Sequence, residues 1–155
     1  MIDKDVFRTD RTLPFYHPNP SNIEEDLKLD NLRKLQQILL AYYAYDPELE
    51  YVQGMADLLS PILYVVRDAT EAFWMFVAMM KRQRENFTIN GTAIQLKMLQ
   101  IQELVRILDP QFFDYLGFNM DTSQFFFCYR WLLVLFKREF ASFEDTLIIW
   151  ETIMS

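Results

Sequence analysis

Apolar residues recur at helical spacing through most of the chain, and no segment clearly alternates between apolar and polar residues as a half-buried strand would. The clearest case has gaps of three and four residues, which place its members on one helix face: Leu32, Leu35, Ile38, Leu39 and Tyr42. Glycine, which turn-rich β folds use freely, accounts for only 3 of 155 residues. The pattern predicts an all-α fold, an irregular multi-helix domain.

Turn and capping signals set the expected limits of the helices. Ser21 with Glu24 forms a capping box before the first long helix, which Asp46-Pro47 ends. Residues 1–22 lack helical periodicity and are expected to form a loop with at most a short helical turn near its start. Later helices are expected at about 52–66, 70–87, 94–108, a short stretch after Pro110, 121–136 with a cap at Asp121 or Thr122, and a last one opened by Ser142. Pro61 should end or kink the helix that contains it.

Two of these helices have a defined apolar face. The face of the helix at 70–87 consists of Phe73, Trp74, Phe76, Val77 and Met80, and that of the helix at 94–108 of Ile94, Met98, Ile101, Leu104, Val105 and Leu108. Both faces are expected to be buried, because apolar stripes at this spacing normally cover a core.

Charge and cysteine content exclude several classes of function. The 15 basic and 22 acidic residues give a net charge of −7, which disfavours nucleic acid and anionic membranes as partners and favours a folded protein. Cys128 is the single cysteine and is expected to be a buried core thiol. No secretory signal or membrane span is visible, so a soluble cytoplasmic protein without direct membrane insertion is expected.

The sequence contains no metal-ligand cluster and no Gly-rich phosphate loop, so an enzyme with its own nucleotide or metal site is disfavoured. Three polar sites remain, and in one of them Arg130 and Arg138 are expected to form structural ion pairs with nearby carboxylates. Arg8 lies before the first long helix, where a planar guanidinium is suited to phosphate contact. Gln53 precedes Gly54 at a helix start, where its amide is able to orient a water molecule. Taken alone, the Arg8 site is more simply a solvated charge cluster and the Gln53 site a plain loop-to-helix junction.

Taken together, the Arg8 and Gln53 sites resemble the TBC family of Rab GTPase activators. That family carries the motifs IxxDxxRT and YxQGM. The first is matched in full by Ile2, Asp5, Arg8 and Thr9, and the second by Tyr51, Gln53, Gly54 and Met55. The later segments ADLLSP, AFW and FKREF and Trp150 follow in family order. Within the family the chain looks most like the branch of family member fifteen and the yeast vacuolar activator.

The resemblance implies an activator that is not itself an enzyme but supplies catalytic residues in trans to a GTP-bound Rab in vesicle trafficking. Arg8 would be the arginine finger and Gln53 the glutamine finger. Asp5 and Tyr51 would hold their loops. The other motif residues would either support the same loops or contact the Rab: Ile2, Thr9, Gly54 and Met55. GTP and Mg²⁺ would belong to the Rab, so no cofactor or metal is expected in this chain. The activator would be recruited peripherally to endomembranes.

Two points stay open at the level of sequence. The family's RxxxW motif precedes the arginine finger and has no counterpart before Ile2, so residues 1–155 are expected to be a partial TBC domain that starts at the finger motif and is truncated at both ends. The alternative to an activator is a helical module that binds a Rab or scaffolds another partner without catalysis. Intact Arg8 and Gln53 favour the activator.

Overall fold

The computed structural model describes residues 1–16, 25–88, 90–117 and 125–155. Within these ranges every regular element is a helix, which confirms the predicted all-α class. The chain divides into two compact units, residues 1–82 and residues 83–155. Among the described residues no helix has the length and apolar character needed to cross a membrane.

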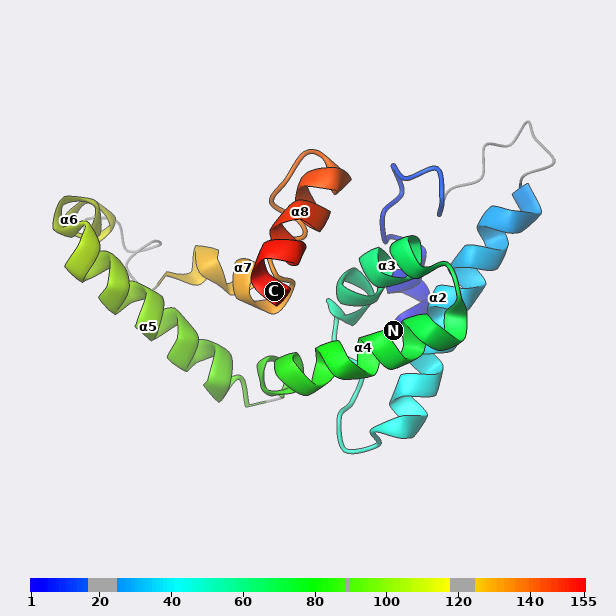
Figure 1. Ribbon diagram of the computed structural model, residues 1–155. Coiled ribbons are helices and arrows are strands. Elements are labelled where there is room, and N and C mark those ends of the chain that lie inside the picture. The colour runs from blue at the N-terminus through cyan, green and yellow to red at the C-terminus, as the bar shows by residue number, and fades with distance from the viewer. Residues whose placement is uncertain (17–24, 89, 118–124) are drawn as a thin grey trace. The chain divides into compact units, whose positions relative to one another are not determined.

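The first unit contains α1 (Ile2–Val6), α2 (Glu25–Tyr45), α3 (Met55–Val66) and all but the last residue of α4 (Ala69–Gln83). Helix α1 packs against both α2 and α3, and α2 packs against α3 (Figure 1). The whole predicted apolar face of α2 is buried, from Leu32 to Tyr42. The ring of Tyr42 meets Phe76 of α4 edge-on at 5.0 Å, which joins α2 to α4. The predicted capping box at Ser21 lies outside the described residues.

Helix α3 is the most deeply buried element of this unit. Every residue from Met55 to Leu63 is buried, as expected of a helix that is apolar on most of its circumference. The helix begins at Met55, three residues later than predicted, because Gly54 has a left-handed backbone with φ 111°. It then continues through Pro61 to Val66, so the proline does not end it. Burial of the flanking turns holds the helix together despite the lost backbone hydrogen bond, which costs about 3 kcal/mol.

Helix α4 departs from its predicted face at one aromatic position. Phe76, Val77 and Met80 are buried, but Trp74 leaves 56% of its surface exposed. Its ring instead leans edge-on against exposed Tyr45, with centroids 6.0 Å apart. An α-helix has room for only one buried stripe here, and Trp74 lies at its margin. The helix also ends at Gln83, where a 3₁₀ turn, η1 (Arg84–Phe87), follows it.

The second unit contains η1, α5 (Thr92–Leu108), α6 (Pro110–Gly117), η2 (Phe126–Cys128), α7 (Tyr129–Leu133) and α8 (Phe143–Met154). The long helix α5 contacts α6, α7 and η1 (Figure 1). One apolar cluster of this unit is formed by buried Leu116, Phe125 and Cys128, with Ile101, Val105, Phe113 and Trp131 packed against them. The predicted burial of Cys128 is therefore confirmed, and α6 starts at Pro110 as expected.

Two predictions for the second unit are wrong. On α5, Ile94 and Met98 are buried as predicted. Leu104 and Leu108 leave 55% and 78% of their surfaces exposed, so only part of the predicted apolar face is buried. The apolar helix predicted through Phe136 ends at Leu133, and Leu135 and Phe136 have left-handed backbones with φ of 50° and 60°. Its predicted cap, Asp121 or Thr122, lies outside the described residues.

Tertiary contacts explain the early end of α7. The indole Nε1 of Trp150 on α8 donates a hydrogen bond of 2.7 Å to the carbonyl oxygen of Leu135. The ring of Phe136 stacks on Trp131 with centroids 5.6 Å apart. These contacts replace the helical hydrogen bonds that the local pattern predicted. The cap predicted for α8 is present, since the Ser142 hydroxyl accepts a hydrogen bond from the backbone N–H of Glu144.

Candidate functional site

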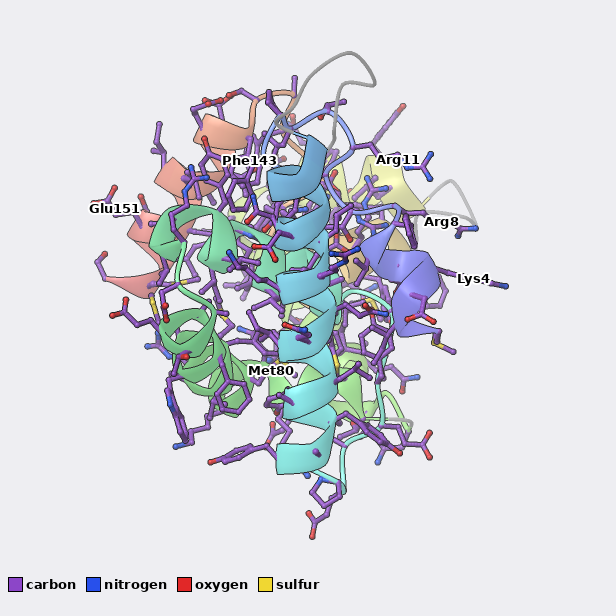
Figure 2. The ribbon with its side chains drawn as sticks, turned by 90° about the vertical axis from the view of Figure 1, so that its right-hand side faces the viewer. Lys4, Arg8, Arg11, Met80, Phe143 and Glu151 are labelled. Atoms are coloured by element: carbon purple, nitrogen blue, oxygen red, sulfur yellow. The ribbon has the colours of Figure 1, made fainter. Side chains whose placement is uncertain are left out.

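The first motif forms a closed turn that presents Arg8. Helical backbone bonds continue beyond α1, from Phe7 N–H to Asp3 and from Thr9 N–H to Asp5, at 3.1 and 3.0 Å. The Thr9 hydroxyl also donates to the carbonyl oxygen of Asp5 at 2.8 Å, and Thr9 is buried. Arg8 lies between these anchored residues with an exposed side chain that projects away from the ribbon (Figure 2). Its backbone is thus fixed while its guanidinium is accessible.

The second motif forms the junction between α2 and α3. Buried Leu49 anchors the segment after α2, and its N–H donates to the carbonyl oxygen of Asp46 at 3.2 Å. Gly54 takes a backbone conformation, φ 111° and ψ −21°, that L residues rarely adopt, and the next residue opens α3. Gln53 precedes this turn and is exposed. The glycine is needed at this point to direct the chain from Gln53 into a buried helix.

One side-chain hydrogen bond joins the two motifs. The hydroxyl of Tyr51 donates to Oδ2 of Asp5 at 2.9 Å, across 46 residues of sequence. Burial raises the pKa of the Tyr51 phenol well above its ordinary value, and the hydrogen bond to Asp5 and the nearby charges of Asp5 and Asp57 raise this pKa further. Tyr51 therefore stays protonated and remains a donor at neutral pH. Both partners are half-buried, which shields the bond from competition with water.

The remaining motif residues support these two segments. Ile2 is half-buried in α1, and Met55 is fully buried as the first residue of α3. The bond between Asp5 and Tyr51 lies three residues before Arg8 and two residues before Gln53. The structure thus brings the two motifs together through Asp5 and Tyr51, with Arg8 and Gln53 both exposed. No hydrogen bond between Arg8 and Gln53 themselves occurs in the described part of the chain.

A second set of contacts holds the segment after Arg8, and sequence reasoning did not find it. The Ser60 hydroxyl of α3 donates to Oδ2 of Asp10, whose backbone is left-handed with φ 45°. The Tyr16 hydroxyl donates to the carbonyl oxygen of Ser60 at 2.7 Å, and burial raises the pKa of that phenol. Because Asp10 and Ser60 are 50 residues apart, no local pattern pointed to the pair.

Comparison with known proteins decides the family. The family model described as Rab-GTPase-TBC domain matches residues 1–155, which is the full length of the chain. This chain belongs to the TBC family. The Tyr51–Asp5 hydrogen bond joins the two segments whose sequences match the family motifs.

Several curated proteins are similar to this TBC chain. Human TBC1 domain family member 17 is 42% identical over 153 residues, covering 99% of this chain and 22% of that protein. GTPase-activating protein GYP7 of Candida glabrata is 39% identical, covering 97% of this chain and 22% of that protein. Rab GTPase-activating protein 22 of Arabidopsis thaliana is 43% identical over 127 residues, covering 82% of this chain and 23% of that protein. The chain thus spans about a fifth of the length of these relatives. Its placement in the branch of member fifteen stays a prediction.

Proposed function

We propose that this chain belongs to a GTPase-activating protein that accelerates GTP hydrolysis by a GTP-bound Rab, with Arg8 and Gln53 entering the Rab active site. The observation that carries the proposal is the hydrogen bond between Tyr51 and Asp5. It ties together the two segments that present an exposed arginine and an exposed glutamine. Similarity to proteins named as Rab or other GTPase activators supports the same activity.

The chemistry assigns a separate task to each finger. Negative charge spreads over the transferred phosphoryl group in the transition state, and an arginine supplied in trans stabilises it, accelerating hydrolysis by roughly 10³–10⁵. That factor corresponds to about 4–7 kcal/mol of barrier. Gln53 would orient the attacking water, because its amide both donates and accepts hydrogen bonds. Gly54, which has no Cβ, would let the glutamine segment approach the nucleotide closely.

The decisive experiment is single-turnover hydrolysis with a panel of purified Rabs loaded with GTP. Arg8→Ala should remove most of the acceleration, by about 10³-fold or more, while binding to the same Rab loaded with a non-hydrolysable GTP analogue changes little. Arg8→Lys should recover little, since an ammonium lacks the planar fork of the guanidinium. Arg82→Ala, at an exposed arginine of α4, is the matched control.

Gln53→Ala should slow hydrolysis without changing the circular dichroism spectrum, because the side chain is exposed. Gln37→Ala, at an exposed position of α2, is its control. If a Rab binds tightly but is never accelerated, the chain belongs to a Rab-binding or scaffold module instead. If Arg8→Ala accelerates as well as the parent protein, the finger assignment is wrong. We place the activity in the cytoplasm, with peripheral recruitment to the membranes that carry the Rab.

A further inference from the structure

The finger segment carries equal numbers of opposite charges in the sequence, but the structure sorts them. Between Ile2 and Arg11 the chain has three carboxylates and three cations: Asp3, Asp5 and Asp10, and Lys4, Arg8 and Arg11. By sequence alone this is a neutral, solvated cluster. In the structure the carboxylates accept hydrogen bonds from the first unit, whereas the side chains of the cations are exposed.

Each carboxylate is held by a donor from the body of the first unit. Asp3 accepts a hydrogen bond from Gln36 of α2 at 2.6 Å, Asp5 from Tyr51 at 2.9 Å, and Asp10 from Ser60 of α3. These donors come from three different parts of the unit. The negative charges of the segment are therefore drawn toward its own helices and partly compensated there.

The cations point the other way. Lys4, Arg8 and Arg11 are exposed, and Figure 2 shows them projecting from the same edge of the segment. Lys4 and Arg8 are four residues apart, a spacing that places both on one side of a helical turn. Arg11 lies beyond the helix, directly after the left-handed residue Asp10. Among the described residues none of the three forms an ion pair. Arg11 keeps its direction through a hydrogen bond of 2.9 Å from its Nε to the carbonyl oxygen of Phe7.

We propose that Lys4 and Arg11 form a cationic rim around Arg8 that docks on carboxylate side chains of the partner GTPase next to its nucleotide. This inference rests on the proposed function. Lys4 precedes Arg8 by four residues and Arg11 follows it by three, and all three side chains project from the same edge of the segment. Lys4 and Arg11 therefore face the protein around the nucleotide while Arg8 faces the phosphate. Because the whole chain has a charge of −7, this rim sets the orientation in which an acidic partner approaches.

The rim is tested by the salt dependence of activation. Lys4→Glu combined with Arg11→Gln should lower kcat/KM toward the most strongly accelerated Rab by about tenfold at low salt, through KM, with kcat nearly unchanged. The loss should shrink as salt is added. Lys4→Glu alone is the cleaner variant, because the Lys4 side chain forms no hydrogen bond or ion pair with the described part of the chain that its replacement would break. Lys81→Glu, at an exposed lysine of α4 in the same unit, is the matched control.

Charge swaps identify the anionic group. Replacing acidic residues near the nucleotide of that Rab by lysine, one at a time, should restore kcat/KM to the Lys4→Glu variant but not to Lys81→Glu. If no replacement restores it, or if the rim variants behave like Lys81→Glu, the inference is overturned.

The outcome separates this inference from the proposed function. If Arg8→Ala abolishes the acceleration but substitutions of Lys4 and Arg11 do not change it, only the cationic rim is overturned. Binding to an analogue-loaded Rab that depends on Lys4 and Arg11, without any acceleration, overturns the proposed function alone. Failure to bind any Rab of the panel overturns both.

Discussion

The hydroxyl of Tyr51 lies 2.9 Å from Oδ2 of Asp5 and is the direct side-chain link between the two motifs that carry the candidate fingers. One partner lies in α1 and the other follows α2, so the bond fixes the finger turn against the start of α3. Catalytic groups held by a rigid support lose little freedom when they meet their target. Under the proposed function, this pair would position Arg8 and Gln53 and would not touch the nucleotide.

Tyr51→Phe tests that positioning role. The variant leaves the half-buried Asp5 carboxylate without this donor, and we expect unfolding in urea to become easier by about 1–3 kcal/mol. Acceleration of the Rab should fall by about tenfold to a hundredfold, mainly in kcat, because the two fingers lose their common support. Tyr43→Phe, at an exposed tyrosine of α2, is the control. If both variants retain the same stability and rate, the hydrogen bond has no positioning role.

Alkaline pH should weaken the first unit through the buried phenol of Tyr16 and the half-buried phenol of Tyr51. Burial is the main cause that raises the pKa of both Tyr16 and Tyr51, so the folded chain keeps protons that the unfolded chain releases near pH 10. The contribution of these phenols is fully present below about pH 10 and is lost as the pH rises further. The urea midpoint should therefore fall above about pH 10. It should fall less steeply in Tyr51→Phe, and an equal slope in both proteins would contradict the assignment.

The regular helices could be predicted because their signals are local. The five-residue face of α2 and the Ser142 cap of α8 depend on neighbours within a turn or two, and both are present. The break at Leu135 was missed because its carbonyl oxygen bonds to Trp150, which is 15 residues away. Trp74 was placed in the core because periodicity gives the direction of a helix face but not its width.

In the candidate site, too, the features set by local sequence were predictable and those set by distant contacts were not. Arg8 and Gln53 were identified from two short motifs, and their exposure is compatible with the proposed role. The contacts that support them were outside the reach of sequence reasoning, since Tyr51 bonds to Asp5 over 46 residues and Ser60 to Asp10 over 50. The separation of carboxylates from cations around Arg8 follows from those long-range contacts, so the sequence alone did not predict it either.

Gly54→Ala separates the backbone requirement of the second motif from side-chain chemistry. A Cβ at φ 111° is strained, and we expect a loss of about 1–2 kcal/mol in the free energy of unfolding. Relief of the strain would also turn the peptide next to Gln53, so acceleration should fall with stability. Gly91→Ala is a matched control, because Gly91 also has positive φ, 61°, and an added Cβ there meets nothing within 4 Å. Gly91→Ala should cost some stability but leave the acceleration intact.

Cys128 offers a probe of the second unit, since it is the single cysteine and lies in the cluster with Leu116 and Phe125. Burial raises the pKa of its thiol to about 11, so little reactive thiolate exists at pH 8. We expect a disulfide reagent such as dithiobis(nitrobenzoate) to label the native protein slowly and the urea-unfolded protein at once. Phe113→Ala should speed native labelling, because Phe113 packs on the cluster, whereas Phe126→Ala at an exposed ring should not. Rapid labelling of the unmodified native protein would mean that this cluster opens readily in solution.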